Sequence, residues 1–469
     1  MTRVAVVGGG LAGLAAAYRL HRLGLEPVVL EAGSTFGGKV QTEIADGLIL
    51  EQGPDSFLVR KPEAVELVRE LGMADDLVPL GRGGSGSAIY AHGRLHLIPP
   101  GLMLGLPTEV WPILRSQLLS PWGKLRAAAD FVLPRDRGEG DQPLGQLVAR
   151  RLGREVLDRL VAPLLTGIYA GDPWSMSTEA TFPQLLELER DARSLVLGAR
   201  EIRRKAPRPA GPPGPMFMTM RSGLGQIIAG LEAALPAASL RPGSPVTDLQ
   251  PDGSGYRLTI AGGEELMAEG VILAVPAPAA GQLLRDIAPQ AAAQLFAVPY
   301  ASLAVAQLAY RPGDVPQLKG SGFLVDRAAG LSITACTYVV NKWPHESPGS
   351  VLLRCYLGRA GEDPLRDDDE SLLNAVRRDI GTVLGVRVEP WLQRLYRWPA
   401  GMPQYTVGHV GRMAAVADSL SRVPALAVAG AAYRGVGMPD VVRQANQAAA
   451  AIAGVLAGEA SEEESPRTN

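Results

Sequence analysis

Gly8-Gly9-Gly10-Leu11-Ala12-Gly13 is the stretch that decides the fold of this chain. An apolar run, residues 3–7, comes directly before it, and residues 11–23 after it carry apolar side chains at helical spacing. Gly24 ends the helical pattern, and a second apolar run, residues 27–31, follows. Strand, glycine-rich turn, helix and strand form a βαβ unit, because two parallel strands need such a crossover.

The glycines of this turn match the G-x-G-x-x-G fingerprint of dinucleotide-binding proteins. Gly8 suits the tight turn, Gly10 lets the backbone approach a pyrophosphate, and Gly13 lets the helix pack closely on the strand. The free N–H groups and the dipole of the helix N-terminus attract phosphate. Glu31 stands at the end of the second strand, where a carboxylate can accept hydrogen bonds from a ribose. We therefore predict a dinucleotide site.

Two further stretches favour a flavin over a nicotinamide nucleotide. Residues 37–42 read Gly-Gly-Lys-Val-Gln-Thr and resemble the second motif of the flavin amine-oxidase superfamily. Residues 435–440 precede a predicted C-terminal helix and resemble the C-terminal FAD motif of the same superfamily. We therefore predict FAD as the cofactor. Residues 81–86 are also rich in glycine, but no convincing helix follows them, so we predict a loop rather than a second nucleotide site.

Composition limits the other classes of function. The chain has 469 residues and a formal net charge of −2, which suits two or three domains and argues against a nucleic-acid partner. The two cysteines, Cys336 and Cys355, lie outside any cluster with metal-ligand spacing, so we expect buried thiols, no metal site and a reducing compartment. No signal-peptide layout and no long uncharged apolar run is found, so we expect a cytoplasmic protein.

We predict an α/β and α+β protein in which a Rossmann-type domain is assembled from separate segments. The expected parts are an FAD-binding domain at 1–84, 219–285 and 421–457, a helical subdomain at 85–205, a proline-rich loop at 206–218, a mixed-sheet substrate domain at 286–420 and a disordered tail at 458–469. The apolar, proline-punctuated residues 95–122 suit a helical core, a channel wall or a membrane-contact surface, and core or channel is favoured.

With these motifs placed, the chain resembles the porphyrinogen oxidases, flavoproteins of haem synthesis, from about residue 3 to residue 457. The resemblance lies in residues 51–57, 167–172 and 435–440. Residues 334–337 with 342–345, and residues 398–399 with 402–405, resemble the Gram-positive-type branch. That branch acts on coproporphyrinogen III, so we prefer this substrate, with protoporphyrinogen IX as the close alternative. Gln52 departs from the family, which often has an arginine there.

The resemblance implies which positions contact FAD and substrate. FAD would be contacted by Gly8, Gly9, Gly10, Leu11, Ala12 and Gly13 at the pyrophosphate, Glu31 and Ala32 at the ribose, Gly38 and Lys39 at the phosphates, Gly53, Pro54, Asp55 and Ser56 at the flavin edge, Val246 at the adenine, and Trp398, Val436, Gly437 and Met438 closing over the cofactor. Gly167, Ile168 and Gly171 would form a rim of the substrate cleft.

The implied chemistry is the removal of six hydrogens from a porphyrinogen, by hydride transfer to the flavin with loss of a pyrrole proton. We assign no catalytic side chain, because His345 and His409 have no visible partner and lone histidines are more often structural. Arg60 and Lys61 would bind the propionates of the substrate, although a solvated turn explains this pair equally well.

The resemblance also implies partners and alternatives. Oxygen is the expected electron acceptor, with a quinone as the alternative, and a ferrochelatase would receive the product. The resemblance allows a protein that contacts a membrane peripherally as well as a soluble protein. Other enzymes of the superfamily, such as an amine oxidase or a carotene desaturase, and a non-catalytic porphyrin carrier that keeps FAD as a structural element, remain alternatives.

Overall fold

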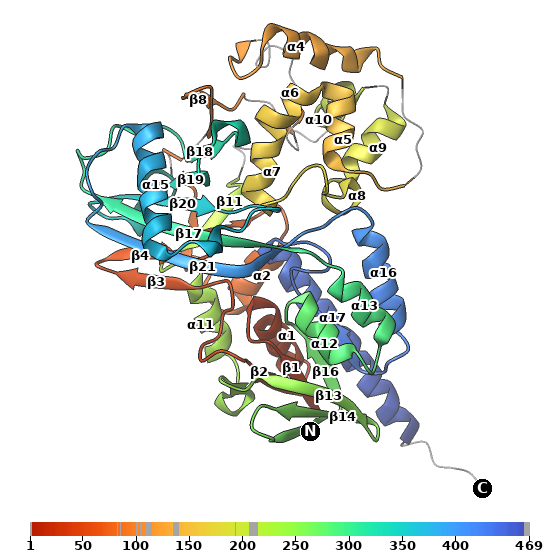
Figure 1. Cartoon of the computed structure of the whole chain (residues 1–469). Helices are drawn as coiled ribbons and strands as arrows, with labels where there is room; N and C mark the ends of the chain where they lie inside the picture. The colour runs from red at the N-terminus through yellow and green to blue at the C-terminus, as the bar shows by residue number, and fades with distance from the viewer. Residues whose placement is uncertain are drawn as a thin grey trace.

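The computed structural model describes residues 2–81, 83–84, 86–99, 102–103, 106–107, 115–134, 140–192, 194–205 and 214–463. Figure 1 shows three regions. A sheet flanked by helices lies at the bottom, with the N-terminus, and a second sheet lies above it. A group of helices drawn in orange and yellow lies at the top.

The lower region is built on a five-stranded parallel sheet. Its order is β12-β2-β1-β16-β22, and every neighbouring pair is parallel. The strands are β1 (Arg3–Val7), β2 (Glu26–Leu30), β12 (Leu240–Arg241), β16 (Gly270–Leu273) and β22 (Leu426–Val428). Segments far apart in the sequence therefore share one sheet. Because helices or further strands cover both of its faces, the strands read as continuous apolar runs rather than as alternating patterns.

Alternate residues of β1 enter two different hydrophobic cores. Val4 and Val6 pack against α1 (Leu11–Arg22), α2 (Glu63–Glu70), α11 (Gly225–Ala233) and α17 (Met438–Glu463). Ala5 and Val7 face the other layer, which holds a three-stranded sheet and three helices: β13 (Val246–Asp252), β14 (Gly255–Ile260), β15 (Glu265–Ala268), α12 (Ala277–Leu284), α13 (Pro289–Phe296) and α16 (His409–Leu420). The period of two along a strand produces this division.

The second region contains a mixed seven-stranded sheet. In order its strands are β21 (Leu392–Pro403), β17 (Tyr300–Tyr310), β20 (Val351–Leu357), β19 (Ile333–Tyr338), β18 (Gly322–Val325), β7 (Ala88–Ala91) and β8 (Arg94–Leu97). Helix α15 (Asp369–Leu384) covers one face. Trp343, which follows α14 (Val339–Lys342), packs on the other face with β4 (Leu48–Glu51), the partner of β3 (Thr42–Ala45).

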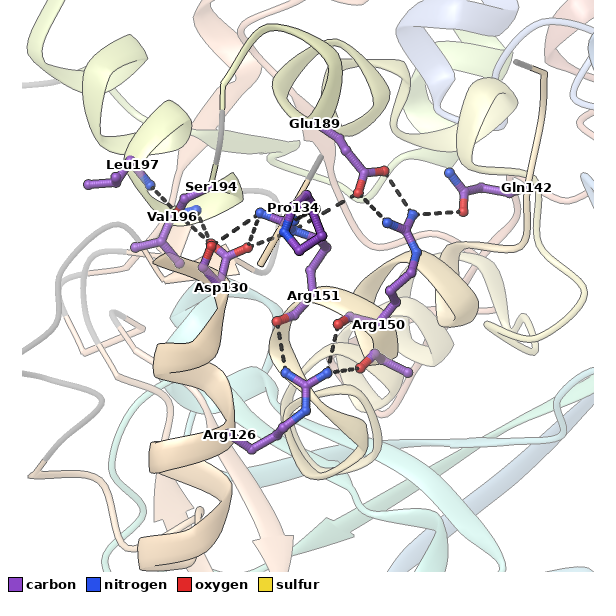
Figure 2. A network of polar contacts seen from close by, with 11 residues as sticks. Arg126, Asp130, Pro134, Gln142, Arg150, Arg151, Glu189, Ser194, Val196 and Leu197 are labelled. Carbon is purple, nitrogen blue, oxygen red and sulfur yellow. Dashed lines mark hydrogen bonds and ion pairs between the residues drawn. The ribbon is translucent and has the colours of Figure 1, made fainter. Parts of the chain in front are cut away.

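The helical region has a core of its own and a buried polar network. Its helices are α4 (Pro121–Ala128), α5 (Leu144–Leu152), α6 (Arg154–Val156), α7 (Ala162–Tyr169), α8 (Thr178–Thr181), α9 (Pro183–Asp191) and α10 (Leu195–Lys205), with a π-turn at Leu157–Val161 (η3). Figure 2 shows the network, in which the guanidinium of Arg151 reaches the carboxylate of Asp130 at 2.7 Å. Asp130 also accepts hydrogen bonds from Ser194 and from the Val196 N–H, so it joins η2 (Ala129–Phe131) to the start of α10.

Short elements complete the described part of the chain. They are β5 (Phe57–Leu58), β6 (Leu77–Pro79) and β11 (Phe217–Met220) in one sheet, β9 (Leu102–Met103) with β10 (Leu106–Pro107), and the 3₁₀ turns η1 (Ala74–Asp76), η4 (Ala237–Ser239), η5 (Arg327–Ala329), η6 (Pro344–Glu346) and η7 (Pro364–Arg366). No helix among the described residues has both the length and the apolar character needed to cross a membrane.

Three sequence-based expectations are wrong at the level of elements. Residues 88–97 are not helical but form β7 and β8, because they complete the edge of the seven-stranded sheet. The domain predicted at 286–420 is not built of a mixed sheet alone, since it includes the long helix α15. Helix α17 runs to Glu463, so residues 458–463 are helical rather than a disordered tail. In addition, α13 and α16 pack on the parallel sheet, although we placed them in the substrate domain.

Two other expectations fall partly outside the described residues. Only residues 214–218 of the predicted proline-rich loop are described, and Phe217 and Met218 among them lie in β11. Residues 100–101, 104–105 and 108–114 of the stretch 95–122 also lie outside the described residues, so its three interpretations stay open.

Candidate cofactor and substrate site

The turn after β1 has the geometry that its glycines predict. Gly8 has φ +104°, and a Cβ there would lie 2.7 Å from the carbonyl oxygen of Ala274. A Cβ on Gly13 would lie 1.8 Å from the carbonyl oxygen of Gly8, so only glycine lets α1 pack so close to the turn. A Cβ on Gly10 would meet its nearest protein atoms at 3.9 Å. Gly10 therefore lines open space, on the side where a ligand can approach the backbone.

The N-terminus of α1 offers donors without a competing acid. No side chain caps it, and its first turn has no acidic residue. The first N–H groups of a helix have no intrahelical acceptor, so these donors are available to an anion. Glu31 follows β2 and accepts hydrogen bonds from the N–H groups of Gly9 at 2.6 Å and Gly33 at 2.7 Å. This places the carboxylate beside the turn, as the dinucleotide fingerprint predicts.

The second motif packs directly on the first. Gly37 donates its N–H to the carbonyl of Gly9 at 2.8 Å, and a Cβ on Gly38 would lie 3.2 Å from the Cα of Gly10. Lys39 is solvent-exposed, yet the surrounding protein lowers the pKa of its ammonium by desolvation. No hydrogen bond or ion pair of its side chain is found within the described residues. An uncapped helix N-terminus beside an unpaired lysine fits the pyrophosphate of a dinucleotide.

The adenosine end of the predicted site lies beside Glu31. Gly243 and Ser244 donate their N–H groups to the carbonyls of Gly33 and Glu31, both at 2.7 Å. Val246 begins β13 two residues later. The chain thus returns to the end of β2 at the position where the family resemblance implies an adenine contact.

The predicted flavin edge, residues 53–56, lies in the loop after β4, and we call residues 51–56 the flavin-edge loop. A Cβ on Gly53 would lie 2.3 Å from the carbonyl oxygen of Lys39, which brings this loop against the second motif. Trp398 of β21 donates its indole N–H to the carbonyl of Gln52 at 2.7 Å, and Gln307 of β17 donates to the carbonyl of Glu51 at 2.8 Å. The seven-stranded sheet therefore positions the loop that would line the flavin.

The carboxylate of Asp55 binds side chains of the protein itself. Its two oxygens accept hydrogen bonds from the ammonium of Lys342 at 2.8 and 3.0 Å, and the guanidinium of Arg354 lies 3.1 Å away. Ser56 donates its hydroxyl to the same carboxylate at 2.7 Å. Burial alone would raise the pKa of Asp55, but the cations of Lys342 and Arg354 hold it well below its usual range. A direct contact between this carboxylate and a cofactor would require these bonds to break.

Two more carboxyls lie around Arg354. Glu346 accepts from Arg354 at 3.2 Å, and Glu51 accepts from Thr42 at 2.8 Å and from the N–H of Leu224. Burial raises the pKa of Glu51 to about 7 and that of Glu346 to about 8, although Arg354 opposes both shifts. Arg354 itself is completely buried, and its carboxyl neighbours raise its pKa further. We call Glu51, Asp55, Lys342, Glu346 and Arg354 the buried charge cluster.

The C-terminal motif forms a second tight turn. Gly435 has φ +115°, and a Cβ there would lie 2.6 Å from the carboxyl carbon of Asp440. Its N–H donates at 2.8 Å to the hydroxyl of Tyr405, which in turn donates to the carbonyl of Ala431 at 2.7 Å. The carboxylate of Asp440 accepts from Lys61 at 2.5 Å and from Arg443 at 2.7 Å.

The predicted substrate residues lie next to this turn. Helix α7 ends at Tyr169, whose carbonyl accepts a hydrogen bond from Gln404 at 3.0 Å, beside Tyr405. Burial, assisted by the charge of Asp440, raises the pKa of Tyr169 to about 12. Gly167 and Ile168 are exposed, whereas Gly171 packs against the sulfur of Met176.

The two cations that we predicted to bind substrate, Arg60 and Lys61, differ in their contacts. Lys61 is occupied by Asp440, while Arg60 is exposed and has no ion pair among the described residues.

Both candidate histidines contact backbone carbonyls. The Nε2 atom of His409 lies 2.9 Å from the carbonyl oxygen of Tyr433, and its ring stacks on Tyr405 at 3.9 Å. Burial lowers the pKa of His409 to about 4. The Nε2 atom of His345 lies 3.3 Å from the carbonyl oxygen of Met220, and burial lowers its pKa as well. Both contacts agree with the structural role predicted for them.

Sequence reasoning missed most of the buried charge cluster and the role of Tyr405. One signal was available, since Arg354 interrupts the apolar strand Val351–Leu357 and a charge on a buried strand needs partners. Lys342 lay in a stretch that was identified only by resemblance. The predicted loop at 81–86 also has a role here, because Gly81 donates its N–H to the carbonyl of Lys342 at 3.0 Å.

Comparison with known proteins agrees with this arrangement. Residues 11–453 match the family model described as flavin containing amine oxidoreductase. A coproporphyrinogen III oxidase of Bacillus subtilis (strain 168) is 38% identical over 460 residues, which cover 95% of this chain and 96% of the relative. A chloroplastic protoporphyrinogen oxidase of Nicotiana tabacum is 28% identical, covering 96% of this chain and 85% of the relative.

A crystal structure of a protein from Exiguobacterium sp. 255-15 superposes with a TM-score of 0.86, at 36% identity, and covers 96% of this chain and 98% of its own. The fold is therefore that of a known class of oxidoreductase. The chain belongs to the flavin containing amine oxidoreductase family, together with the coproporphyrinogen III oxidases that it resembles over nearly its whole length.

Proposed function

We propose that this chain oxidises coproporphyrinogen III to coproporphyrin III with FAD as cofactor and oxygen as electron acceptor. The observation that carries the proposal is the meeting of five distant segments around the turn after β1. Hydrogen bonds and close packing link residues 8–13 to 37–39, 37–39 to 51–56 and 51–56 to Trp398, and Met438 of the C-terminal motif packs in one core with Leu11. Three of the five segments carry motifs of the porphyrinogen oxidases: 51–56, Trp398 and 435–440. The 38% identity to a coproporphyrinogen III oxidase over 95% of the chain supports the choice of substrate.

When bound, FAD supplies hydride acceptance, and the chain supplies binding and orientation. The N–H groups at the start of α1 and the ammonium of Lys39 would hold the pyrophosphate, and Glu31 the ribose. The carbonyl contacts of Gln307 and Trp398 keep the flavin-edge loop in place. Arg60, which has no ion pair among the described residues, would bind a propionate of the substrate, and Ile168, 53% exposed, would give the cleft an apolar rim.

Further parts of the proposal concern partners and location. We propose a cytoplasmic protein that passes coproporphyrin to a ferrochelatase. Peripheral contact with a membrane is the alternative placement, and the exposed Trp122 and Leu125 of α4 would suit it.

The test compares initial rates of porphyrin fluorescence with coproporphyrinogen III and with protoporphyrinogen IX, under air, with hydrogen peroxide assayed in parallel. Much faster turnover of coproporphyrinogen with peroxide formed is the expected result. Preference for protoporphyrinogen would reassign the substrate, and turnover without peroxide would reassign the acceptor. If neither substrate reacts, the porphyrinogen hypothesis fails, and a flavin that neither substrate bleaches without oxygen would support the non-catalytic carrier.

A further inference from the structure

The buried charge cluster has an odd number of charges. Asp55, Glu51 and Glu346 supply three carboxyls, whereas Lys342 and Arg354 supply two cations. Arg354, Glu51 and Glu346 have no exposed surface. If every group were ionised, the cluster would leave one uncompensated negative charge in the protein interior. An unpaired buried charge is unfavourable enough that a group usually takes up or releases a proton instead.

Among the described residues, no further cation forms an ion pair with these three carboxyls. The remaining polar groups around the cluster are the hydroxyl of Thr42 on β3, the amide of Gln307 on β17, the phenols of Tyr356 on β20 and Tyr396 on β21, and the outer ion pair of Glu43 with Arg394. Burial raises the pKa of both tyrosines, so both phenols stay neutral, and the outer pair is balanced by itself. Lys39 is not among the largest influences on the pKa values of Glu51, Asp55 and Glu346.

The extra proton cannot reside on Asp55. This carboxylate contacts both cations and a serine hydroxyl, and its pKa is held well below its usual range. Glu51 has no cation within ion-pair distance among the described residues, and Glu346 has only Arg354. The Oε1 atom of Glu346 is buried and has no hydrogen-bond partner among the described residues. An ionised oxygen in that position would be costly, whereas a protonated carboxyl is much less so.

We propose that Glu51 and Glu346 share one proton at neutral pH, and that they act through Asp55 and Arg354 as positioning residues for the flavin-edge loop. Because the two carboxyls interact through Arg354, the proton belongs to the pair rather than to either residue. The raised pKa values of about 7 and about 8 support this assignment. Release of the proton to solvent changes the charge of the cluster from zero to minus one, and no other bond changes.

The change in the charge of the cluster reaches the cofactor only if the flavin-edge loop lines the flavin. The effect on the flavin therefore rests on the proposed function. A negative charge beneath the loop opposes the negative charge that a flavin gains on reduction. The reduction potential of the bound flavin should therefore fall more steeply as pH rises through the range of about 7 to about 8.

The first experiment locates the proton in the purified holoprotein by infrared spectroscopy of the protonated carboxyl band in wild type, Glu51→Gln and Glu346→Gln. Wild type should show one buried protonated carboxyl at pH 7. Each single variant should lose it, because two carboxylates then balance two cations. The matched control is Glu370→Gln at the exposed start of α15, which should keep the band. A wild-type protein without the band, or a variant that retains it, overturns the shared proton.

The second experiment measures the midpoint potential of the bound flavin against pH. Wild type and Glu346→Gln should agree well below pH 7 and diverge well above pH 8, with wild type lower. Curves that stay parallel would overturn the positioning role. If the infrared result holds and turnover of porphyrinogen is absent, the shared proton stands and the proposed function fails, so the two failures are distinguishable. If the glutamine variants do not fold, the pH titration of the wild-type carboxyl band decides alone.

Discussion

The ammonium of Lys342 lies 2.8 Å from a carboxylate oxygen of Asp55, although 287 residues separate the two. Lys342 ends α14, which packs on the seven-stranded sheet, and Asp55 lies in the loop after β4. Both side chains are largely buried, with 17% and 10% of their surface exposed. The bond therefore attaches the predicted flavin-edge loop to the second sheet.

Replacing Lys342 should loosen the loop and weaken flavin binding. In Lys342→Met, Asp55 keeps Arg354 but loses its shortest ion pair, and removing one partner of a buried pair costs roughly 3 kcal/mol. We expect a lower free energy of unfolding and a dissociation constant for flavin raised about tenfold, which corresponds to about 1.4 kcal/mol. Titration of the flavin-free protein followed by flavin fluorescence measures the second effect.

The control is Lys319→Met, since Lys319 is an exposed lysine without an ion pair among the described residues. It should leave both quantities unchanged. A Lys342→Met protein that binds flavin like wild type would show that Asp55 does not position the loop.

The two glycines of the turn after β1 should respond differently to alanine. Gly10→Ala should leave the fold intact, because its Cβ would lie 3.9 Å from the nearest protein atoms, but it should reduce flavin binding by occupying the space predicted for the pyrophosphate. Gly13→Ala should disturb the fold itself, because its Cβ would lie 1.8 Å from the Gly8 carbonyl oxygen. Circular dichroism and the flavin content of the purified proteins separate the two effects. Full flavin content in Gly10→Ala would exclude the cofactor from this turn.

The buried pair Arg151–Asp130 should control the order of the helical region. Asp130→Asn leaves the guanidinium of Arg151, which is 1% exposed, with only the more distant carboxylate of Glu189 at 3.9 Å, at a cost of roughly 3 kcal/mol. Amide hydrogen exchange should therefore increase in α5 and α10, which the network of Figure 2 joins, and not in β1 or β16. The control is Asp191→Asn, whose carboxylate is 78% exposed. Unchanged exchange in α5 would show that the pair contributes little.

The parts of the fold that the sequence could predict are those fixed by neighbouring residues. The βαβ unit follows from a glycine turn between two apolar runs, and the structure has it at β1, α1 and β2. Helix α15 was missed although its signals were local, since Asp368 caps its start by accepting the Ser371 N–H and Gly385 ends it at φ +73°. That error was avoidable.

The buried charge cluster is a different case. Its ion pairs join Asp55 to Lys342 and Arg354 across most of the chain, and no local pattern states which strands bring them together. Residues 88–97 were misassigned for a similar reason, because β7 and β8 are short and their hairpin joins the sheet only through β18, more than two hundred residues later. The sequence therefore could not predict which strands and side chains far apart in the chain lie together.

His409 should make stability depend on pH in the acid range. Its pKa is about 4 in the folded protein, because burial outweighs its contact with the Tyr433 carbonyl, and 6.5 is the ordinary value expected after unfolding. Between these values the unfolded chain binds more protons than the folded one, so stability falls as pH is lowered from 6.5 towards 4. The loss approaches about 3 kcal/mol at the lower end.

Urea unfolding of wild type and His409→Gln at several pH values in this range measures the effect. The variant should show a flatter dependence, because it lacks the titrating ring, whereas His21→Gln at the exposed end of α1 should behave like wild type. The pH dependence of turnover should be the same in all three proteins. A change in that profile in His409→Gln would give this histidine a role in the reaction after all.

Arg60 should contribute to the binding of the substrate's carboxylates rather than to the reaction step. It is exposed and without an ion pair in the described part of the chain, next to Lys61, which Asp440 already holds. Loss of a hydrogen bond to a charged group costs about 1.5 to 3 kcal/mol, so Arg60→Gln should raise KM for coproporphyrinogen III about tenfold or more with kcat nearly unchanged. Initial rates at varied substrate concentration measure both constants.

Two controls separate charge from packing at Arg60. The effect should vanish with the methyl ester of the substrate, which has no carboxylates. Arg311→Gln, which replaces an exposed arginine just beyond β17, should leave KM unchanged. An equal rise in KM for the ester would mean that Arg60 acts through packing and not through charge.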